Sequence, residues 1–329
     1  MALGIYDRAF REYWYSDRRE DGSLTIYQLE NDTGTGELLC YEVFPGIQLT
    51  YNSLDMNTCF QGVRPAHGFL QINHCFEGCW EMELSGGMVG FLGEGDMAVN
   101  DPAKLQITNS RLPLGRYRGI TILLELQSAQ TSLKEFFPDS GIDLYSIQNK
   151  TCPDNEWFLL KARPEIEHIF SELYCVDDRI RKTYNLVKTV ELLLFLSIVD
   201  DKSSEVLPRF SKQVVESTKR VYTFLMESPF DKVTICELAA RFNVAETSLR
   251  QCFKSVYGQP IGAFLRSERI RRASYLLRDE EELTVGQIAQ LVGYDNPSKF
   301  AAAFKAVMGQ KPLSYRHRND RSNDRLDYK

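Results

Sequence analysis

The stretch TICELAARFNVAETSLRQCFKSVYG, residues 234–258, shares its pattern with a second stretch, TVGQIAQLVGYDNPSKFAAAFKAVMG, residues 284–309. The displacement is 50 positions at the start of each copy and 51 at its FK pair, so a turn in the second copy holds one extra residue. Thr234 precedes Glu237 by three residues, and Thr284 precedes Gln287 by the same distance, which is the spacing of a helix capping box. The sequence therefore predicts two copies of one helical unit.

Each copy predicts two short helices joined by a tight turn. The turns fall at residues 242–245 and 292–295, and Asn296 with Pro297 is a favourable N-cap and first-turn pair for the helix that follows. The residues expected to be buried are Leu238, Ala239, Leu249 and Phe253 in the first copy and Ile288, Ala289, Phe300 and Phe304 in the second. Two short helices with a small alanine at their crossing are typical of a helix-turn-helix motif, although an ordinary helical bundle shares the local pattern.

Residues 260–277, PIGAFLRSERIRRASYLL, predict one continuous helix between the two copies. At 1.5 Å per residue its 18 residues would span about 27 Å, and successive major grooves on one face of a duplex are about 34 Å apart. The helix could thus place two motifs in neighbouring grooves. Its polar faces carry Arg266, Arg269, Arg271 and Arg272, each of which suits either a solvated surface or a phosphate contact.

This C-terminal part resembles the DNA-binding domain of AraC/XylS-type transcriptional regulators over residues 213–318, about a third of the chain. The resemblance rests on the FK pair of each second helix, the proline-containing turns after Gly258 and Gly309, and the closing Tyr315-Arg316. It implies an all-α domain of seven helices, with two helix-turn-helix motifs joined by a linker helix. It also implies double-stranded DNA as a partner and RNA polymerase as a further candidate.

The resemblance assigns DNA-facing positions in both recognition helices. They are Thr247, Arg250, Gln251 and Lys254 in the first helix and Ser298, Lys299 and Lys305 in the second. Arginine can pair with guanine, glutamine with adenine, and lysine with phosphate. Ala301 and Ala302 occupy further positions of the second helix, where the family usually carries a basic or polar residue in place of Ala302. We therefore expect the first motif to dominate base recognition.

The charge distribution supports a DNA-binding C-terminal half. The net charge of the chain is −6, but residues 211–329 carry 20 Lys and Arg against 14 Asp and Glu. The remaining 19 basic and 31 acidic residues leave residues 1–210 at −12. Such an asymmetry indicates a nucleic-acid-binding module joined to a different one.

The N-terminal half predicts a string of strands. Short apolar or alternating segments, separated by glycine-containing breaks, run from residue 23 to residue 127 with no intervening helix, which favours a β-sandwich or barrel. Helices are expected from Pro164 to Tyr174 and from Asp177 to Val199. The family resemblance implies a cupin-like β-barrel with trailing helices that binds an effector or dimerises.

These patterns give a domain plan and a location. Together with the resemblance, they lead us to expect a regulatory domain over residues 1–200, a linker over 201–211, a DNA-binding domain over 212–318 and a polar tail over 319–329. The longest apolar run, from Leu192 to Val199, is too short to span a bilayer, and the N-terminus has no secretory pattern. We therefore expect a cytoplasmic protein without a membrane partner.

The candidate effector site and the candidate subunit contact both lie in the regulatory domain. Arg64, His67 and His74 are polar or cationic groups that could fix a small molecule, with Trp80 as an aromatic wall, although each could instead serve packing alone. Leu186, Val190, Leu193 and Leu194 lie at helical spacing and are candidates for a homodimer contact, although a helix packed on the barrel explains the same spacing.

A regulator fused to an enzyme is the alternative function. It would use Cys75 or Cys79 as a thiol acceptor, or a degenerate cupin active site. The spacing of Cys75, Cys79 and His74 fits no zinc motif, and the barrel has no HxH followed by a glutamate and a later histidine. We therefore expect no metal, no cofactor and no enzymatic activity.

Overall fold

The computed structural model describes residues 4–11, 15–22, 24–59, 64–105, 107–152, 158–199, 208–231, 233–280 and 282–323. The chain divides into two units, Met1–Lys212 with Ser255–Gly258, and Gln213–Lys254 with Gln259–Lys329. Of the predicted linker, residues 201–207 lie outside the described residues.

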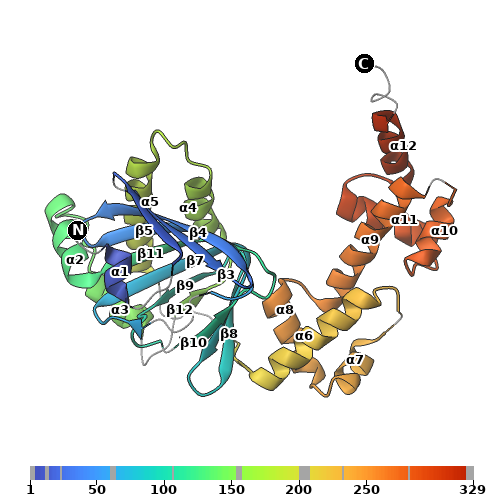
Figure 1. Cartoon of the computed structure of the whole chain (residues 1–329), viewed down its shortest axis with the longest axis horizontal. Coiled ribbons are helices and arrows are strands. Elements are labelled where there is room, and N and C mark those ends of the chain that lie inside the picture. Colours follow the sequence, from blue (N-terminus) through green and yellow to red (C-terminus); the bar gives the residue numbers. More distant parts are fainter. Residues whose placement is uncertain are drawn as a thin grey trace. The chain divides into compact units, whose positions relative to one another are not determined.

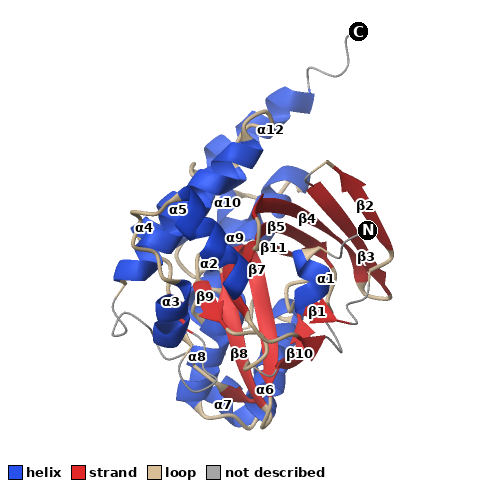
Figure 2. Cartoon of the chain, turned by 90° about the vertical axis from the view of Figure 1, so that its left-hand side faces the viewer, coloured by secondary structure: helices blue, strands red, loops and turns tan. Residues whose placement is uncertain are grey.

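The first unit is built on an antiparallel sheet (Figures 1 and 2). Its main path runs in the order β12 (Phe158–Leu160), β9 (Met97–Asn100), β7 (Phe69–Leu84), β11 (Tyr117–Glu125), β5 (Ile47–Asp55), β4 (Gly34–Phe44), β3 (Leu24–Asn31) and β2 (Asp17–Asp21). Off this path, β7 also pairs with β8 (Met88–Gly93) and β10 (Ile107–Arg111), and β8 pairs with β13 (Phe210–Ser211). A small second sheet joins β1 (Phe10–Arg11), which follows α1 (Ile5–Ala9), to β6 (Arg64–Pro65).

Strand β7 contains a bulge that reverses which face its side chains occupy. Cys75 pairs with Gly119 and Glu77 pairs with Arg118, so Phe76 has no partner on β11. Side chains alternate between faces along a strand, and one extra residue inverts that alternation. Gly78 follows the bulge with φ of +94°, and a Cβ there would lie 2.2 Å from the carbonyl oxygen of Arg116. The bulge thus places a glycine where any side chain would collide.

Each face of the sheet has its own hydrophobic core. Leu70 and Ile72 of β7 pack with the helices that cover the outer face, namely α2 (Leu126–Phe136), α3 (Leu144–Thr151), α4 (Pro164–Tyr174) and α5 (Arg181–Ile198). Beyond the bulge, Trp80 and Met82 belong to the core of the opposite, inner face. The helix expected at 164–174 is α4, and the one expected at 177–199 is α5, which begins four residues later than predicted, at Arg181. The sequence did not predict α2 and α3.

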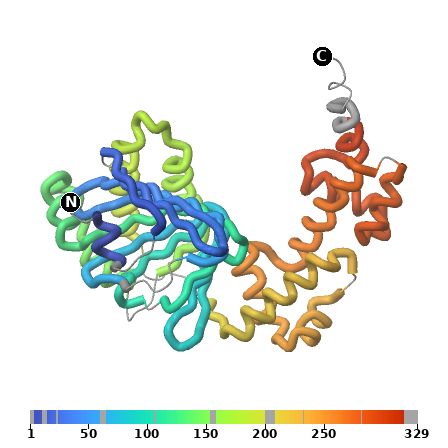
Figure 3. Tube along the Cα trace, viewed as in Figure 1, coloured from blue at the N-terminus to red at the C-terminus, as the bar shows by residue number. Residues whose placement is uncertain are grey.

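The second unit contains the predicted helices. In order they are α6 (Lys212–Glu227), α7 (Ile235–Arg241), α8 (Glu246–Tyr257), α9 (Ile261–Asp279), α10 (Val285–Leu291), α11 (Pro297–Met308) and α12 (Pro312–Asn323) (Figure 3). Both capping boxes are present, since Thr234 and Glu237 bond reciprocally, as do Thr284 and Gln287. The eight residues expected to be buried are all buried.

The two copies share the geometry of their turns. Asn243, in the first turn, has φ of +50°, and Gly293, fifty positions later, has φ of +84°. The next amide bonds back to an alanine carbonyl in each copy, Val244 to Ala239 at 3.0 Å and Tyr294 to Ala289 at 2.8 Å. This is the hydrogen-bond pattern of a Schellman turn, in which a residue of positive φ ends the helix. The sequence repeat is therefore a structural repeat.

Candidate nucleic-acid interface and candidate ligand cavity

Helix α8, the first recognition helix, has one buried and one exposed face. Leu249 and Phe253 are fully buried. The side chains at the four positions that the family resemblance assigns to DNA contact, Thr247, Arg250, Gln251 and Lys254, are all exposed. The local sequence sets this division, because the apolar residues recur every three or four positions and leave the polar ones on the opposite face.

Arg250 is held by a carboxylate of its own helix. Its Nε donates to Oε1 of Glu246 at 3.0 Å, one turn earlier along α8. Both side chains are about half exposed, so the pair is screened by solvent and contributes little stability. Glu246 therefore orients the guanidinium without removing it from the surface.

Helix α11 presents a less polar surface. Asn296 caps it by accepting from the amides of Ser298 at 2.8 Å and Lys299 at 3.1 Å. Ser298, Lys299 and Lys305 are exposed, as is Ala302 between them. An alanine methyl group can make only apolar contact with a base edge. The second helix thus offers fewer hydrogen-bonding groups than α8.

The arginines of α9 separate into structural and available groups. Arg269 donates to the carbonyls of Pro229 at 2.7 Å and Asp231 at 3.0 Å, which ties α9 to the loop after α6. Arg271 and Arg272 both contact the buried carboxylate of Glu268. Arg266 is exposed and forms no ion pair within the described part of the chain. The sequence could not distinguish Arg266 from the others as a candidate phosphate contact.

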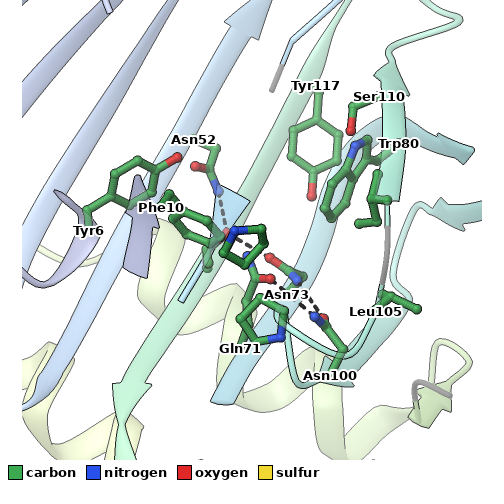
Figure 4. Close-up of a pocket in the computed structure, with 14 residues that line it drawn as sticks. Tyr6, Phe10, Asn52, Gln71, Asn73, Trp80, Asn100, Leu105, Ser110 and Tyr117 are labelled. Carbon is green, nitrogen blue, oxygen red and sulfur yellow. Dashed lines mark hydrogen bonds between the residues drawn. The ribbon is translucent and has the colours of Figure 1, made fainter. Parts of the chain in front are cut away.

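A cavity of about 80 Å³ lies on the inner face of the sheet in the first unit (Figure 4). Polar side chains from four neighbouring strands form a hydrogen-bonded series along it. Asn52 Nδ2 donates to Thr121 Oγ1 at 2.9 Å, and Thr121 Oγ1 donates to Asn73 Oδ1 at 2.9 Å. Asn73 Nδ2 donates to Asn100 Oδ1 at 3.4 Å, and Asn100 Nδ2 donates to Gln71 Oε1 at 3.3 Å. We call these five residues the amide ladder.

Of the four residues that the sequence suggested for an effector, the structure places Trp80 in this cavity. His67 is exposed on a turn. Arg64 lies on β6 next to Pro65, which lines the cavity, but its side chain is outside the described residues. The amide ladder was not predicted from the sequence. Polar Gln71 and Asn73, alternating with apolar residues on a buried strand, were the signal that could have revealed it.

His74 lies on the outer face, because the bulge separates it from Trp80. Its ring stacks on Phe170 of α4 at a centroid distance of 4.0 Å, and Nδ1 is 3.5 Å from the hydroxyl of Tyr174. Its Nε2 is buried with no hydrogen-bond partner within the described part of the chain. Burial lowers the pKa of His74 to about 4, so the ring is neutral at pH 7.

Cys75, next to His74, has no setting that would favour a thiolate. Cys75 is fully buried, and burial raises its pKa well above the usual range, with nearby acidic groups acting in the same direction. A reactive thiol needs a lowered pKa and access to solvent. Among the described residues, no group of three or more His, Cys, Asp or Glu is arranged to hold a metal ion.

The four candidate dimer residues occupy different environments on α5. Leu193 is fully buried in the outer core, and Leu186 and Val190 are partly buried against it. Leu194 is 43% exposed, and so are Val187 and Ile198 on the same helix, at 52% and 81%. The helices of the described residues include none that is long and apolar enough to cross a membrane.

Comparisons with known proteins concern mainly the second unit. The model of a helix-turn-helix domain family matches residues 238–318. The HTH-type transcriptional activator RhaR of Enterobacter sp. (strain 638) is 35% identical over 75 residues, which are 23% of this chain and 26% of that protein. A putative AraC-like transcription regulator of Streptomyces antibioticus is 34% identical over 125 residues, 38% of this chain and 40% of that protein.

Among solved structures, unsaturated fatty acid bound wild-type ToxT from Vibrio cholerae strain SCE256 aligns with 87% of this chain and 97% of its own. The TM-score is 0.34 and the identity is 14%. The chain spans less than half the length of the two curated relatives named above. The matching region coincides with the two repeated motifs. The C-terminal unit of this chain is therefore a helix-turn-helix domain of the AraC type.

Proposed function

We propose that the protein is a sequence-specific DNA-binding transcriptional regulator in which the first helix-turn-helix dominates base recognition. The observation that carries this proposal is the duplicated turn geometry, which presents two exposed recognition helices in the basic part of the chain. The contacts would come from Thr247, Arg250, Gln251 and Lys254 of α8 and from Ser298, Lys299 and Lys305 of α11. We place the protein in the cytoplasm with its DNA, and RNA polymerase is a further candidate partner.

We also propose that a small molecule controls this activity from the N-terminal domain. The support is the cavity lined by Trp80 and the amide ladder on the inner face of the sheet. A concave site with apolar walls and a few convergent polar groups is the usual form of a ligand site. For this domain, comprising residues 1–200, we propose a cupin-like barrel, with Arg64, whose strand adjoins the cavity, as a further candidate for ligand contact.

A homodimer contact through α5 completes the proposal. Val187, Leu194 and Ile198 recur at intervals of seven and four residues and leave an apolar stripe exposed. Exposed apolar side chains at this spacing suit packing against a second helix. Leu186 and Val190 would border the contact, while Leu193 supports it from the core.

The alternative, a regulator fused to an enzyme, has no observation in its favour. It would use Cys75 or Cys79 as a thiol acceptor, both of which are buried, or a degenerate cupin active site. We therefore propose a regulator without catalytic activity.

Selection of binding sites from random double-stranded oligonucleotides by the full chain tests the function. We expect enrichment of one motif, and we expect alanine at both Arg250 and Gln251 to abolish the enrichment while general DNA affinity remains. A full-length, folded protein that enriches no sequence would contradict the proposal.

A further inference from the structure

The cavity of the first unit has no charged residue among the described residues that line it. Its polar lining consists of the amide ladder together with Ser110 and the hydroxyls of Tyr6 and Tyr117. Burial raises the pKa of Tyr117 well above its usual range, so its hydroxyl stays protonated. A ligand inside would therefore meet dipoles that donate and accept hydrogen bonds, and no ionised group of the described lining.

The amide ladder retains both donors and acceptors that could form hydrogen bonds with a ligand. Each of its four links uses one donor and one acceptor, whereas a carboxamide has two N–H donors and an oxygen that can accept twice. At the two ends, Asn52 Oδ1 and Gln71 Nε2 make no hydrogen bond within the described part of the chain. Ser110 Oγ is buried without a partner among the same residues. Because a buried polar atom without a partner is unfavourable, the Ser110 hydroxyl supports a hydrogen bond to a ligand in this cavity.

Apolar side chains form the remaining walls and limit the size of a ligand. Figure 4 shows Tyr117, Trp80 and Ser110 together at one end of the cavity and Tyr6 with Phe10 at the other, with the ladder between them. The cavity of about 80 Å³ is smaller than the ~150 Å³ of a cavity that holds benzene. The part of a ligand inside the cavity would thus be compact, and the rest of a larger ligand would extend out of the cavity.

We propose that this cavity binds an uncharged small molecule that both donates and accepts hydrogen bonds along one edge, through carboxamide or hydroxyl groups, and turns an apolar face to the aromatic walls. This inference rests on the proposed effector control and specifies the chemical class of the effector. An isolated carboxylate or ammonium ion loses far more hydration on burial than a neutral amide of the same shape, and the described lining offers it no counter-ion. The cavity therefore selects against both signs of charge.

Two matched sets of probes test this selectivity on the full chain. Acetamide, acetate and acetamidine have one shape in neutral, anionic and cationic forms, and benzamide, benzoate and benzamidine repeat the series with a ring. Dissociation constants come from ligand-observed NMR titrations up to 50 mM. We expect the neutral member of at least one set to bind at least tenfold more tightly than both of its charged counterparts.

Variants locate the binding and invert its preference. Asn73→Asp puts a carboxylate in the middle of the ladder, so we expect the amidine to become the preferred member of the same set. Asn100→Asp makes the same change one link away in the ladder. It replaces Asn73→Asp in the test if circular dichroism shows that Asn73→Asp does not fold. Asn57→Asp, at an exposed turn position, is the matched control and should keep the neutral preference.

Three results would overturn the inference. The first is an ion that binds as tightly as its neutral counterpart, above all an anion whose binding disappears in Arg64→Ala. The second is the absence of binding by both amides at 50 mM, and the third is a neutral preference that the folded ladder variant retains. Sequence-specific DNA binding is measured on the same samples. If it persists while the neutral preference fails, only this inference fails, whereas loss of DNA specificity contradicts the proposed function instead.

Discussion

At the scale of single residues, Arg250 combines exposure with a fixed orientation. Its planar guanidinium suits the two acceptors of guanine, and Glu246 restricts the side chain before DNA arrives. An exposed ion pair of this kind is worth ~0–1 kcal/mol, so Arg250 can leave Glu246 for a base at small cost. The ion pair with Glu246 therefore presents little obstacle to a base contact.

Replacing Arg250 by alanine should cost ~1–3 kcal/mol of discrimination at one base pair, because a bidentate base contact is lost. Competition binding with a panel of single-base variants of the selected site measures this. Lys305→Ala should instead weaken binding to all sequences alike. Arg179→Ala, which removes an exposed arginine paired with Asp177, is the matched control and should change neither property. Unaltered base preference in Arg250→Ala would show that α8 is not the dominant reader.

His74 makes stability depend on pH. Its pKa is about 4 in the folded protein against an ordinary value of 6.5, because the ring is buried against Phe170. The unfolded chain therefore binds a proton at a higher pH than the folded one. As a result, the free energy of unfolding decreases as the pH falls from 6.5 to 4. A difference of about 2.5 units corresponds to about 3 kcal/mol. Denaturant unfolding of the wild type and His74→Leu at several pH values measures it.

In that comparison, His74→Leu should lose less stability than the wild type between pH 7 and pH 4.5. His67→Gln, at an exposed position, controls for the removal of a histidine and should follow the wild type. Parallel curves for His74→Leu and the wild type would contradict the buried, neutral state of the ring.

At the scale of elements, the sequence predicted the helices whose positions depend on interactions between residues close together in the chain. The capping boxes, the repeat and the apolar spacing act within a few residues, and the helices of the second unit follow them. The string of strands predicted between residues 23 and 127 is also present, although the sequence did not predict which strands pair with one another. Helix α2 was missed because its first residue, Leu126, directly follows strand β11 and extends the apolar pattern of that strand.

The candidate ligand site was harder to predict because it depends on long-range register. His74 and Trp80 are six residues apart and would share a face of a regular strand. The bulge at Phe76 puts them on opposite faces, and that bulge exists only in the pairing of β7 with β11. The amide ladder likewise forms only when four strands align, so none of its members stands out alone.

Helix α5 carries the prediction that belongs to this scale. Leu194→Glu with Ile198→Glu should convert a dimer into a folded monomer, because both side chains are exposed and their burial between subunits would be lost. Light scattering after size-exclusion chromatography measures the mass. Leu114→Glu, as exposed as Leu194, is the matched control and should remain dimeric.

Leu193→Glu separates a subunit contact from core packing. Leu193 is fully buried, so a glutamate there should unfold the domain rather than dissociate it. A Leu194→Glu, Ile198→Glu protein of unchanged mass would show that the α5 stripe is not the subunit contact.

At the scale of the whole molecule, charge is divided along the chain. The +6 of residues 211–329 attracts DNA, while the −12 of residues 1–210 repels it and discourages non-specific association through that half. Binding should therefore depend on a small set of cations in the C-terminal domain. Those exposed on the recognition helices are Arg250, Lys254, Lys299 and Lys305, with Arg266 on α9.

The salt dependence of DNA affinity tests this division by counting phosphate contacts. Each phosphate neutralised releases condensed counterions, so the logarithm of the affinity falls linearly with that of the salt concentration, by about 0.9 per contact. Lys254→Ala and Lys305→Ala should each reduce the slope by about 1, and the double variant by about 2, if each lysine neutralises one phosphate. Fluorescence anisotropy of the full chain on its selected site, between 50 and 300 mM salt, measures these slopes.

Lys134→Ala removes an exposed lysine from the acidic half and is the control. It should leave the slope unchanged, because that half does not meet the phosphates. A smaller slope in Lys134→Ala, together with unchanged slopes in the C-terminal variants, would place the phosphate contacts in the N-terminal half and contradict this prediction.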